Sequence, residues 1–403
     1  MIRIAATLCS LVVLMFLVPV VLAAQRIQGR MPDGSDIPAG MAAIDTTDYT
    51  LFSDLPKPML NEVIHRLEKM VIEYRDRTES LSSKRDDRKL PLYLFSNRDD
   101  YIDQGGREDS TGLFDGEHLL AYVGTRPDAR AWHVIQHEAF HQYLTGKLGY
   151  EIPVWLNEGL AEYFSESMYT GDTFVSGVVP PWRLKRLQDS LKDGSLPSVA
   201  ELVEMSHVRW NAQLRQENYD MAWSLVQFLA HGDGGKYQDG MIRYVQEARS
   251  DRLAARAFGE IFGDAKDVQE RWRSYWLDYP AEESKRTFAV AAMEAVCSYV
   301  ARAGLAHQAV KDMPQLESLS SKDELRQPKN DTLPISLLSE YLQWAPKLGV
   351  WDFNPKVGPG IELVMDGGVK VKGRYTLRNG RVDQVDGWID DGKPQPGHRR
   401  KRR

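Results

Sequence analysis

Residues 132–164 read WHVIQHEAFHQYLTGKLGYEIPVWLNEGLAEYF. Apolar residues recur at helical spacing on both sides of Gly146 and Gly149, which predicts two helices joined by a turn. In the first predicted helix, His137 and His141 are four residues apart, so they share one face and lie about 6 Å apart along the axis. Two imidazoles at this spacing can bind one metal ion together.

The second predicted helix offers a third metal ligand. It opens with Asn157-Glu158, and the carboxylate of Glu158 can complete a set with His137 and His141. Glu138 lies beside the histidine face, where it can act on a water molecule without being a ligand itself. The alternative is a surface helix with two solvated histidines and an unrelated acidic helix. We disfavour this alternative because three features point to one metal site: the histidine pair, the amphipathic helix around it and the second helix.

The segments HEAFH (residues 137–141) and NEGLAE (residues 157–162) resemble the motifs of the gluzincin zinc metallopeptidases. With FSNRDDY and GLFDGEHLLAYV upstream, residues 90–230 are similar more particularly to the DUF1570 gluzincins. The resemblance implies an α+β fold: a thermolysin-like domain with a small sheet and the zinc helix, followed by a helical lobe. Two departures, a shorter gap between the motifs and no Gly-x-Met-Glu-Asn element, argue against an aminopeptidase.

The resemblance also assigns roles to individual residues. It implies one zinc ion bound by His137, His141 and Glu158, with Glu138 as the general base. Glu162, one turn after Glu158, is expected to accept a hydrogen bond from the second ring nitrogen of a ligand histidine. Such a bond fixes the tautomer and raises the basicity of the ligand.

Two further elements of the site are expected on the same grounds. A sheet edge should pair with an extended substrate, because an edge offers unpaired N–H and C=O groups; an internal strand is the alternative. The residues expected at this edge are His118, Leu119, Leu120, Ala121, Tyr122 and Val123. Tyr219, near the start of a later helix, is the candidate donor to a developing oxyanion. His207 and His231 are its rivals, and a purely packed aromatic is the alternative.

Composition limits the possible classes of function. The chain has 403 residues, enough for two or three domains, with 42% hydrophobic and 27% charged residues, as in an ordinary globular protein. A net charge of −6 gives no support for a nucleic-acid partner. Of the two cysteines, Cys297 lies in an Ala-rich apolar segment, which predicts a buried, inert thiol.

The first 24 residues are typical of a secretory signal peptide. A short basic start, Met1-Ile2-Arg3, precedes an almost wholly apolar run that ends in small residues before Gln25. We therefore expect export to the periplasm or the extracellular space, with no stable membrane insertion after cleavage. An uncleaved N-terminal anchor is the alternative, because the apolar run can just span a bilayer.

Composition shifts divide the rest of the chain. After Asn379-Gly380, a strong hairpin signal, the alternating pattern of a strand continues to about Trp388. The basic end HRRKRR is expected to be solvated. The predicted units are a signal peptide (1–24), an N-terminal segment with an amphipathic helix (25–89), a metallopeptidase-like catalytic domain (90–285), a helix and linker (286–334), a small C-terminal β-hairpin module (335–397) and a basic tail (398–403).

Two functional hypotheses follow. The first is a secreted zinc metallopeptidase that hydrolyses peptide bonds of a peptide or protein substrate. The second is a non-catalytic binding protein in which zinc is structural and the C-terminal module carries recognition. The sequence favours the first, because a structural zinc site has no use for an acid such as Glu138 beside an open coordination position.

Overall fold

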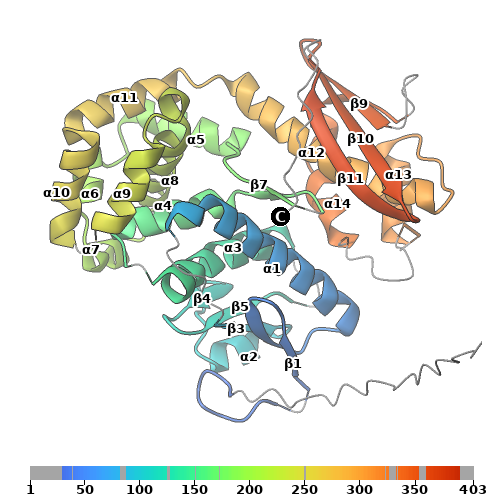
Figure 1. Cartoon of the computed structure of the whole chain (residues 1–403), viewed down its shortest axis with the longest axis horizontal. Coiled ribbons are helices and arrows are strands. Elements are labelled where there is room, and N and C mark those ends of the chain that lie inside the picture. The colour runs from blue at the N-terminus through green and yellow to red at the C-terminus, as the bar shows by residue number, and fades with distance from the viewer. Residues whose placement is uncertain are drawn as a thin grey trace, which may run out of the picture.

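A computed structural model of the chain describes residues 30–38, 40–81, 88–124, 128–149, 151–171, 173–248, 251–322, 324–325, 333, 335–353 and 360–390. The architecture is α+β, with an N-terminal sheet, a central group of helices and a second sheet near the C-terminus (Figure 1). The predicted signal peptide (1–24) and basic tail (398–403) lie outside the described residues, so both stay predictions.

The N-terminal sheet has five strands in the order β1-β2-β3-β5-β4. Strands β2, β3 and β5 are parallel, whereas β1 and β4 pair antiparallel at the two edges. The sequence LPLYLF forms the central strand β3 and is buried along almost its whole length, as a strand covered on both faces must be. The strands are β1 (Ala42–Asp45), β2 (Tyr49–Ser53), β3 (Leu90–Phe95), β4 (Gly112–Phe114) and β5 (Leu119–Tyr122).

The expectation that residues 118–123 form the sheet edge is wrong. Strand β5 is hydrogen-bonded to β3 on one side and to β4 on the other, so it is internal. The turn at Asp115-Gly116, where Gly116 has a φ of 104°, folds the chain back and places β4 outside β5. The true edge beside the histidine helix is therefore β4.

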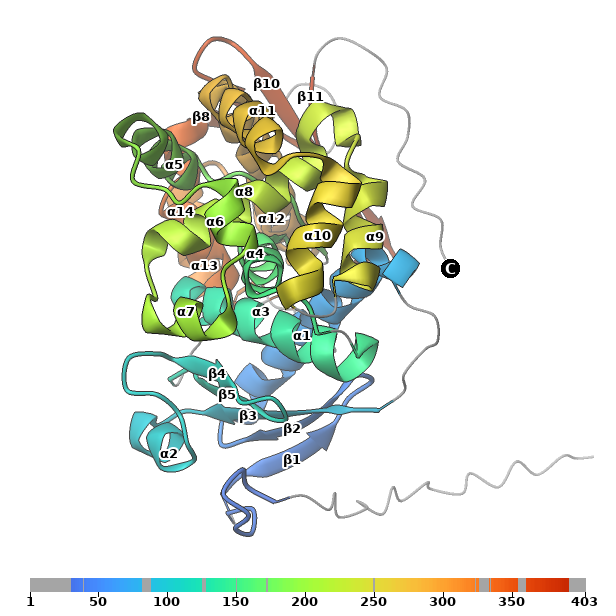
Figure 2. The same cartoon turned by 90° about the vertical axis from the view of Figure 1, so that its left-hand side faces the viewer.

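Helices cover both faces of this sheet. The long helix α1 (Lys57–Arg77) and the histidine helix α3 (Ala129–Tyr143) lie on one face, as the side view shows (Figure 2). Their apolar sides join the main core, for example through Leu67 and Ile135. The short helix α2 (Arg98–Asp103) packs on the other face, where Tyr101 belongs to a smaller apolar cluster.

A tight connection joins the two motif helices. Helix α3 continues into one turn of π-helix, Leu144–Leu148, and Gly149 ends it in the left-handed conformation with a φ of 66°. Pro153 then precedes α4 (Val154–Ser165), which carries NEGLAE. This short path returns α4 alongside α3.

The helical lobe follows α4 and lies on the opposite side of it from the C-terminal sheet (Figure 1). Helix α8 approaches α4 closely because Gly159 has no side chain: a Cβ there would lie 2.6 Å from the carbonyl oxygen of Ala222. A small hairpin, β6 (Met168–Tyr169) and β7 (Phe174–Val175), follows α4 and lies beside α1 and α12 (Ala281–Leu305). The lobe contains the helices α5 (Pro181–Asp193), α6 (Val199–Val203), α7 (His207–Ala212), α8 (Gln216–His231), α9 (Gln238–Glu247), α10 (Asp251–Phe262) and α11 (Ala265–Leu277).

The C-terminal part is a four-stranded antiparallel sheet packed on a long helix. Its strand order is β11-β10-β9-β8, and Gly373 of β10 lies against Met293 and Cys297 of the helix α12. The predicted Asn379-Gly380 hairpin is confirmed, with positive φ at both residues. The elements are α12 (Ala281–Leu305), α13 (Met313–Ser321), α14 (Ile335–Leu342), β8 (Gly349–Asp352), β9 (Gly360–Met365), β10 (Lys370–Arg378) and β11 (Arg381–Ile389).

This C-terminal part shares the main apolar core with the histidine helix. The hydroxyl of Tyr341 on α14 donates to the carbonyl of Tyr169, and Arg66 of α1 pairs with Glu340. Within the segment 286–334, expected to be a helix and a linker, residues 313–321 form a second helix, α13.

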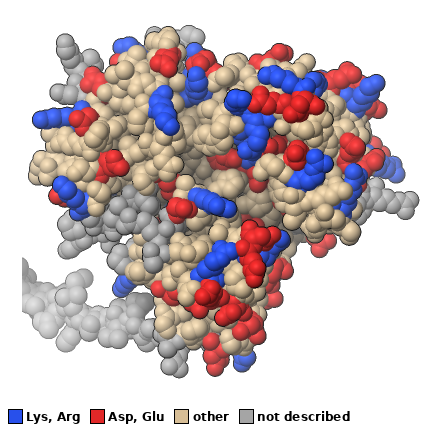
Figure 3. Space-filling model, turned by 180° about the vertical axis from the view of Figure 1, so that it is seen from behind, with Lys and Arg blue, Asp and Glu red and all other residues tan. Residues whose placement is uncertain are grey.

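Helix α12 is long and apolar and carries Cys297, which was predicted to be buried. Among the described residues, α12 is the one helix long and apolar enough to cross a membrane, and 78% of its most apolar window is buried inside the protein. Its Cys297 is fully buried, as predicted, and burial raises the pKa of the thiol to about 12. Seen from behind, basic and acidic side chains are interspersed over the surface (Figure 3).

Candidate metal centre

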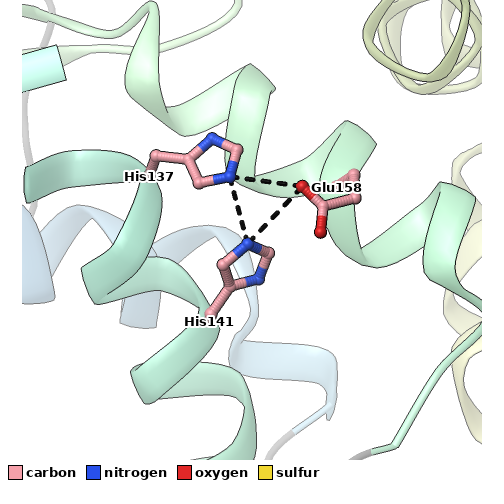
Figure 4. A group of neighbouring side chains, drawn as sticks. All are labelled: His137, His141 and Glu158. Carbon is pink, nitrogen blue, oxygen red and sulfur yellow. Dashed lines mark hydrogen bonds and ion pairs between the residues drawn. The ribbon is translucent and has the colours of Figure 1, made fainter. Parts of the chain in front are cut away.

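Three side chains from α3 and α4 point toward one another (Figure 4). The Nε2 atoms of His137 and His141 are 3.1 Å apart. Glu158 Oε2 lies 3.3 Å from His137 Nε2 and 3.7 Å from His141 Nε2. The predicted ligand set therefore converges, although Glu158 is seventeen positions beyond His141 in the sequence.

The triangle of donor atoms has the size that a zinc ion requires. Zinc binds nitrogen and oxygen ligands at about 2.0–2.1 Å, so two ligands of a tetrahedral site lie roughly 3.3 Å apart. The three separations, 3.1, 3.3 and 3.7 Å, bracket this value. Two histidines and one carboxylate also leave a fourth position for water or substrate, as in catalytic rather than structural zinc sites.

Hydrogen-bond partners of the two Nδ1 atoms determine which nitrogen of each histidine ring faces the centre. His137 Nδ1 lies 3.1 Å from Glu162 Oε1, and His141 Nδ1 lies 2.9 Å from Asn157 Oδ1. An ionised carboxylate can only accept, so His137 Nδ1 must carry a proton. In its neutral form the ring then presents an Nε2 lone pair to the centre. Two ring nitrogens and a carboxylate oxygen placed in this way could hold one metal ion between them.

The charges around the histidines favour the same conclusion. Burial opposes a charged carboxylate at Glu158, but the neighbouring histidines lower its pKa to about 2. Burial likewise opposes a positive charge on His137 and His141, yet the facing carboxylates raise the pKa of both rings. The site as folded thus stabilises positive charge between these side chains.

Glu138 lies next to the triangle and is held by the edge strand. The backbone N–H of Phe114 donates to Glu138 Oε2 at 2.9 Å. Strand β4 can come this close because Gly112 has no side chain: a Cβ there would lie 2.5 Å from Val134 Cγ1 and 3.4 Å from Glu138 Cγ. The carboxylate of Glu138 is therefore fixed by the sheet edge, close enough to His141 for its charge to raise the pKa of that ring.

Tyr219 reaches the same region from α8. Its ring centroid is 6.5 Å from that of His137, and Trp210 packs edge-on against it at 5.1 Å. Burial, reinforced by the charge of Glu158, raises the pKa of Tyr219 to about 12, so its hydroxyl keeps its proton at neutral pH. Of its rivals, His231 instead pairs with and stacks on Tyr163, and His207 is exposed.

A second group of potential ligands is formed by His133 of α3 together with Glu162 and Glu166 at the C-terminal end of α4. The buried guanidinium of Arg183 already pairs with both carboxylates, at 2.6 Å each. Because a cation of the protein occupies this position, the group is part of the support around the first centre.

Sequence reasoning missed three participants in the site. Asn157 was noted only as part of the motif, and its contact with His141 depends on how α4 docks. Arg183 is more than twenty residues beyond Glu158, with no spacing pattern to link them. The backbone of Phe114 carries no residue-type signal. The expected strand His118–Val123 lies one strand further from Glu138 than β4.

Comparison with known proteins adds one match. Residues 132–253, from the start of the histidine motif to the start of α10, match the model of a family described as a protein of unknown function (DUF1570). The match contains every residue of the centre except those of β4 and covers less than a third of the chain. No curated protein matches the chain.

Proposed function

We propose that the chain is a zinc-dependent hydrolase that cleaves peptide bonds. The single observation that carries the proposal is the convergence of His137, His141 and Glu158 with Glu138 alongside. Both imidazoles have an outer partner for the second ring nitrogen, and Glu158 is partly buried. Two imidazoles and one carboxylate are the ligands of a catalytic zinc site.

The roles of the protein groups follow from their positions. A bound zinc ion would supply a Lewis acid that polarises a carbonyl group and makes water more acidic. Glu138 would accept the proton of the attacking water and deliver it to the leaving amine. The hydroxyl of Tyr219, protonated because its pKa is about 12, would donate to the oxygen that becomes negative.

The edge strand supports a peptide as substrate. Tyr122 N–H donates to Thr111 C=O, and Asp115 N–H to His118 C=O, so the alternate residues Gly112 and Phe114 direct their backbone groups away from β5. The Phe114 N–H meets Glu138. No hydrogen bond reaches the Phe114 carbonyl from the residues that the structure describes. It can accept an N–H from an extended chain beside Glu138.

Replacement of Glu138 by Gln tests the proposal. The amide cannot take a proton, but it preserves the shape of the side chain and leaves all three ligands in place. We expect the variant to keep about one zinc per chain and to lose hydrolysis of a peptide library. A Glu138→Gln variant that cleaves as fast as the wild type rules out this mechanism. A wild type that binds zinc but cleaves no peptide favours the structural-zinc hypothesis.

A further inference from the structure

Arg183 is a buried charge at the start of α5. Its side chain is almost wholly inaccessible, with 1% of the residue exposed. The guanidinium pairs with Glu162 Oε2 at 2.6 Å and with Glu166 Oε1 at 2.6 Å, and its Nε lies 3.4 Å from Asp220. Removing a charge from water is costly, so an arginine at this depth requires the partners that surround it.

The contacts of Arg183 continue directly to a ligand histidine. Glu162 uses one oxygen for Arg183 and the other for His137 Nδ1, at 3.1 Å. The other side of the guanidinium is fixed by α8, since its central carbon lies 4.3 Å from the ring centroid of Trp223. A continuous path therefore runs from α8 through Arg183 and Glu162 to His137.

We propose that Arg183 is a positioning residue that orients His137 for zinc through Glu162. This inference rests on the proposed zinc function and names a residue that acts without touching the metal. A free Glu162 side chain could rotate and carry the imidazole with it. With both oxygens engaged, the carboxylate holds the ring in one orientation with Nε2 toward the centre.

The planar guanidinium is essential to this role. Arginine presents several donors in a rigid fork, so it can hold Glu162 and Glu166 at once while its face stacks on Trp223. Lysine keeps the positive charge but concentrates it on a single ammonium group without the planar face. Arg183→Lys therefore tests geometry separately from charge.

Arg186 offers a matched control on the same helix. It is an arginine that also pairs with Asp220, at 2.6 Å, but its side chain is exposed, and within the described part of the chain its ion pair is with Asp220 alone. Arg186→Lys makes the same chemical change one turn away, outside the path to His137.

The experiment measures metal binding by the full chain. Zinc affinity is determined by competition with a chromophoric chelator, and Co²⁺ replaces zinc to report ligand geometry in its visible spectrum. We expect Arg183→Lys to weaken zinc binding about 10–100-fold and to change the Co²⁺ spectrum. Arg186→Lys should match the wild type in both. Unchanged affinity and spectrum in a folded Arg183→Lys protein would overturn the inference.

A double-mutant cycle with Glu162→Gln separates positioning from a general loss of structure. If Arg183 acts through Glu162, the double variant binds zinc about as weakly as Glu162→Gln alone; additive losses would contradict the path.

Should Arg183→Lys fail to fold, Glu162→Asp breaks the same path with Arg183 in place, and unchanged zinc affinity there overturns the inference. A wild type without zinc affinity refutes the proposed function. If the wild type binds zinc and cleaves peptides, and Arg183→Lys has the same zinc affinity and Co²⁺ spectrum as the wild type, only this inference is refuted.

Discussion

The backbone N–H of Phe114 donates a hydrogen bond to the Glu138 carboxylate, with the nitrogen 2.9 Å from Oε2. This bond joins the edge of the sheet to the residue proposed as general base. It orients the carboxylate without involving a metal ligand. The position of β4 should therefore affect catalysis separately from metal binding.

Gly112→Ala tests this relationship. The added methyl group would lie 2.5 Å from Val134 Cγ1. Because a valine in a helix strongly prefers one χ1 rotamer, we expect the strand to move away from the helix and the bond from Phe114 to Glu138 to lengthen. We expect kcat on a cleaved peptide to fall about tenfold, a change of about 1.4 kcal/mol in the barrier, with one zinc per chain retained. Gly259→Ala is the control, because nothing lies within 4 Å of a Cβ there. Unaltered kcat in the Gly112 variant would show that the strand does not position the base.

Tyr219→Phe removes the proposed oxyanion donor and keeps the ring packed against Trp210. We expect kcat to fall by about 10²-fold with little change in KM, since the bond would form only as charge develops. Because the pKa of Tyr219 is raised to about 12, the wild type should lose no activity through its ionisation below about pH 11. Steady-state kinetics between pH 6 and 10.5 measure both effects. A variant with wild-type kcat would leave Tyr219 as a packed aromatic.

Asn157 should matter for metal affinity. Its side-chain oxygen accepts from His141 Nδ1, 2.9 Å away, so Asn157→Ala frees that ring to rotate. A 10–100-fold loss of zinc affinity is expected, whereas Asn157→Asp, which retains an acceptor, should bind zinc at least as well as the alanine variant. Chelator competition gives both constants. Equal affinities for wild type and Asn157→Ala would mean that this hydrogen bond does not support the ligand.

Gly159→Ala tests the packing that brings α8 to the centre. A Cβ at this position would lie 2.6 Å from the Ala222 carbonyl oxygen and 2.7 Å from Val226 Cγ2. Backbone cannot move as a side chain can, so we expect a loss of about 1–3 kcal/mol in the free energy of unfolding. Chemical denaturation measures it, with the exposed helical Gly259→Ala expected to be neutral or stabilising. Equal stability of the Gly159 variant would mean that the two helices separate without cost.

The sequence predicted those parts of the fold and site that depend on local spacing. His137 and His141 share a face because they are one helical turn apart, and the helix ending at Arg77 and the hairpin at Asn379-Gly380 follow from equally local patterns.

The sequence could not predict the features that depend on contacts between residues far apart in the chain. Whether β4 or β5 forms the edge depends on which of the two strands pairs with β3, and the alternating pattern is the same in both cases. Arg183 reaches Glu162 only because α5 docks behind α4. Neither relationship leaves a spacing signature in the chain.

Equilibrium zinc binding to the wild type and to Glu158→Gln tests the central claim most directly. The change removes the one ligand that the histidine motif does not contain, while the amide keeps the volume of the side chain. The account predicts one zinc per wild-type chain and a loss of affinity of at least 10²-fold in the variant, by analogy with the smaller losses expected for outer partners. A wild type that takes up no zinc, or a variant that binds zinc as tightly as the wild type, would contradict it.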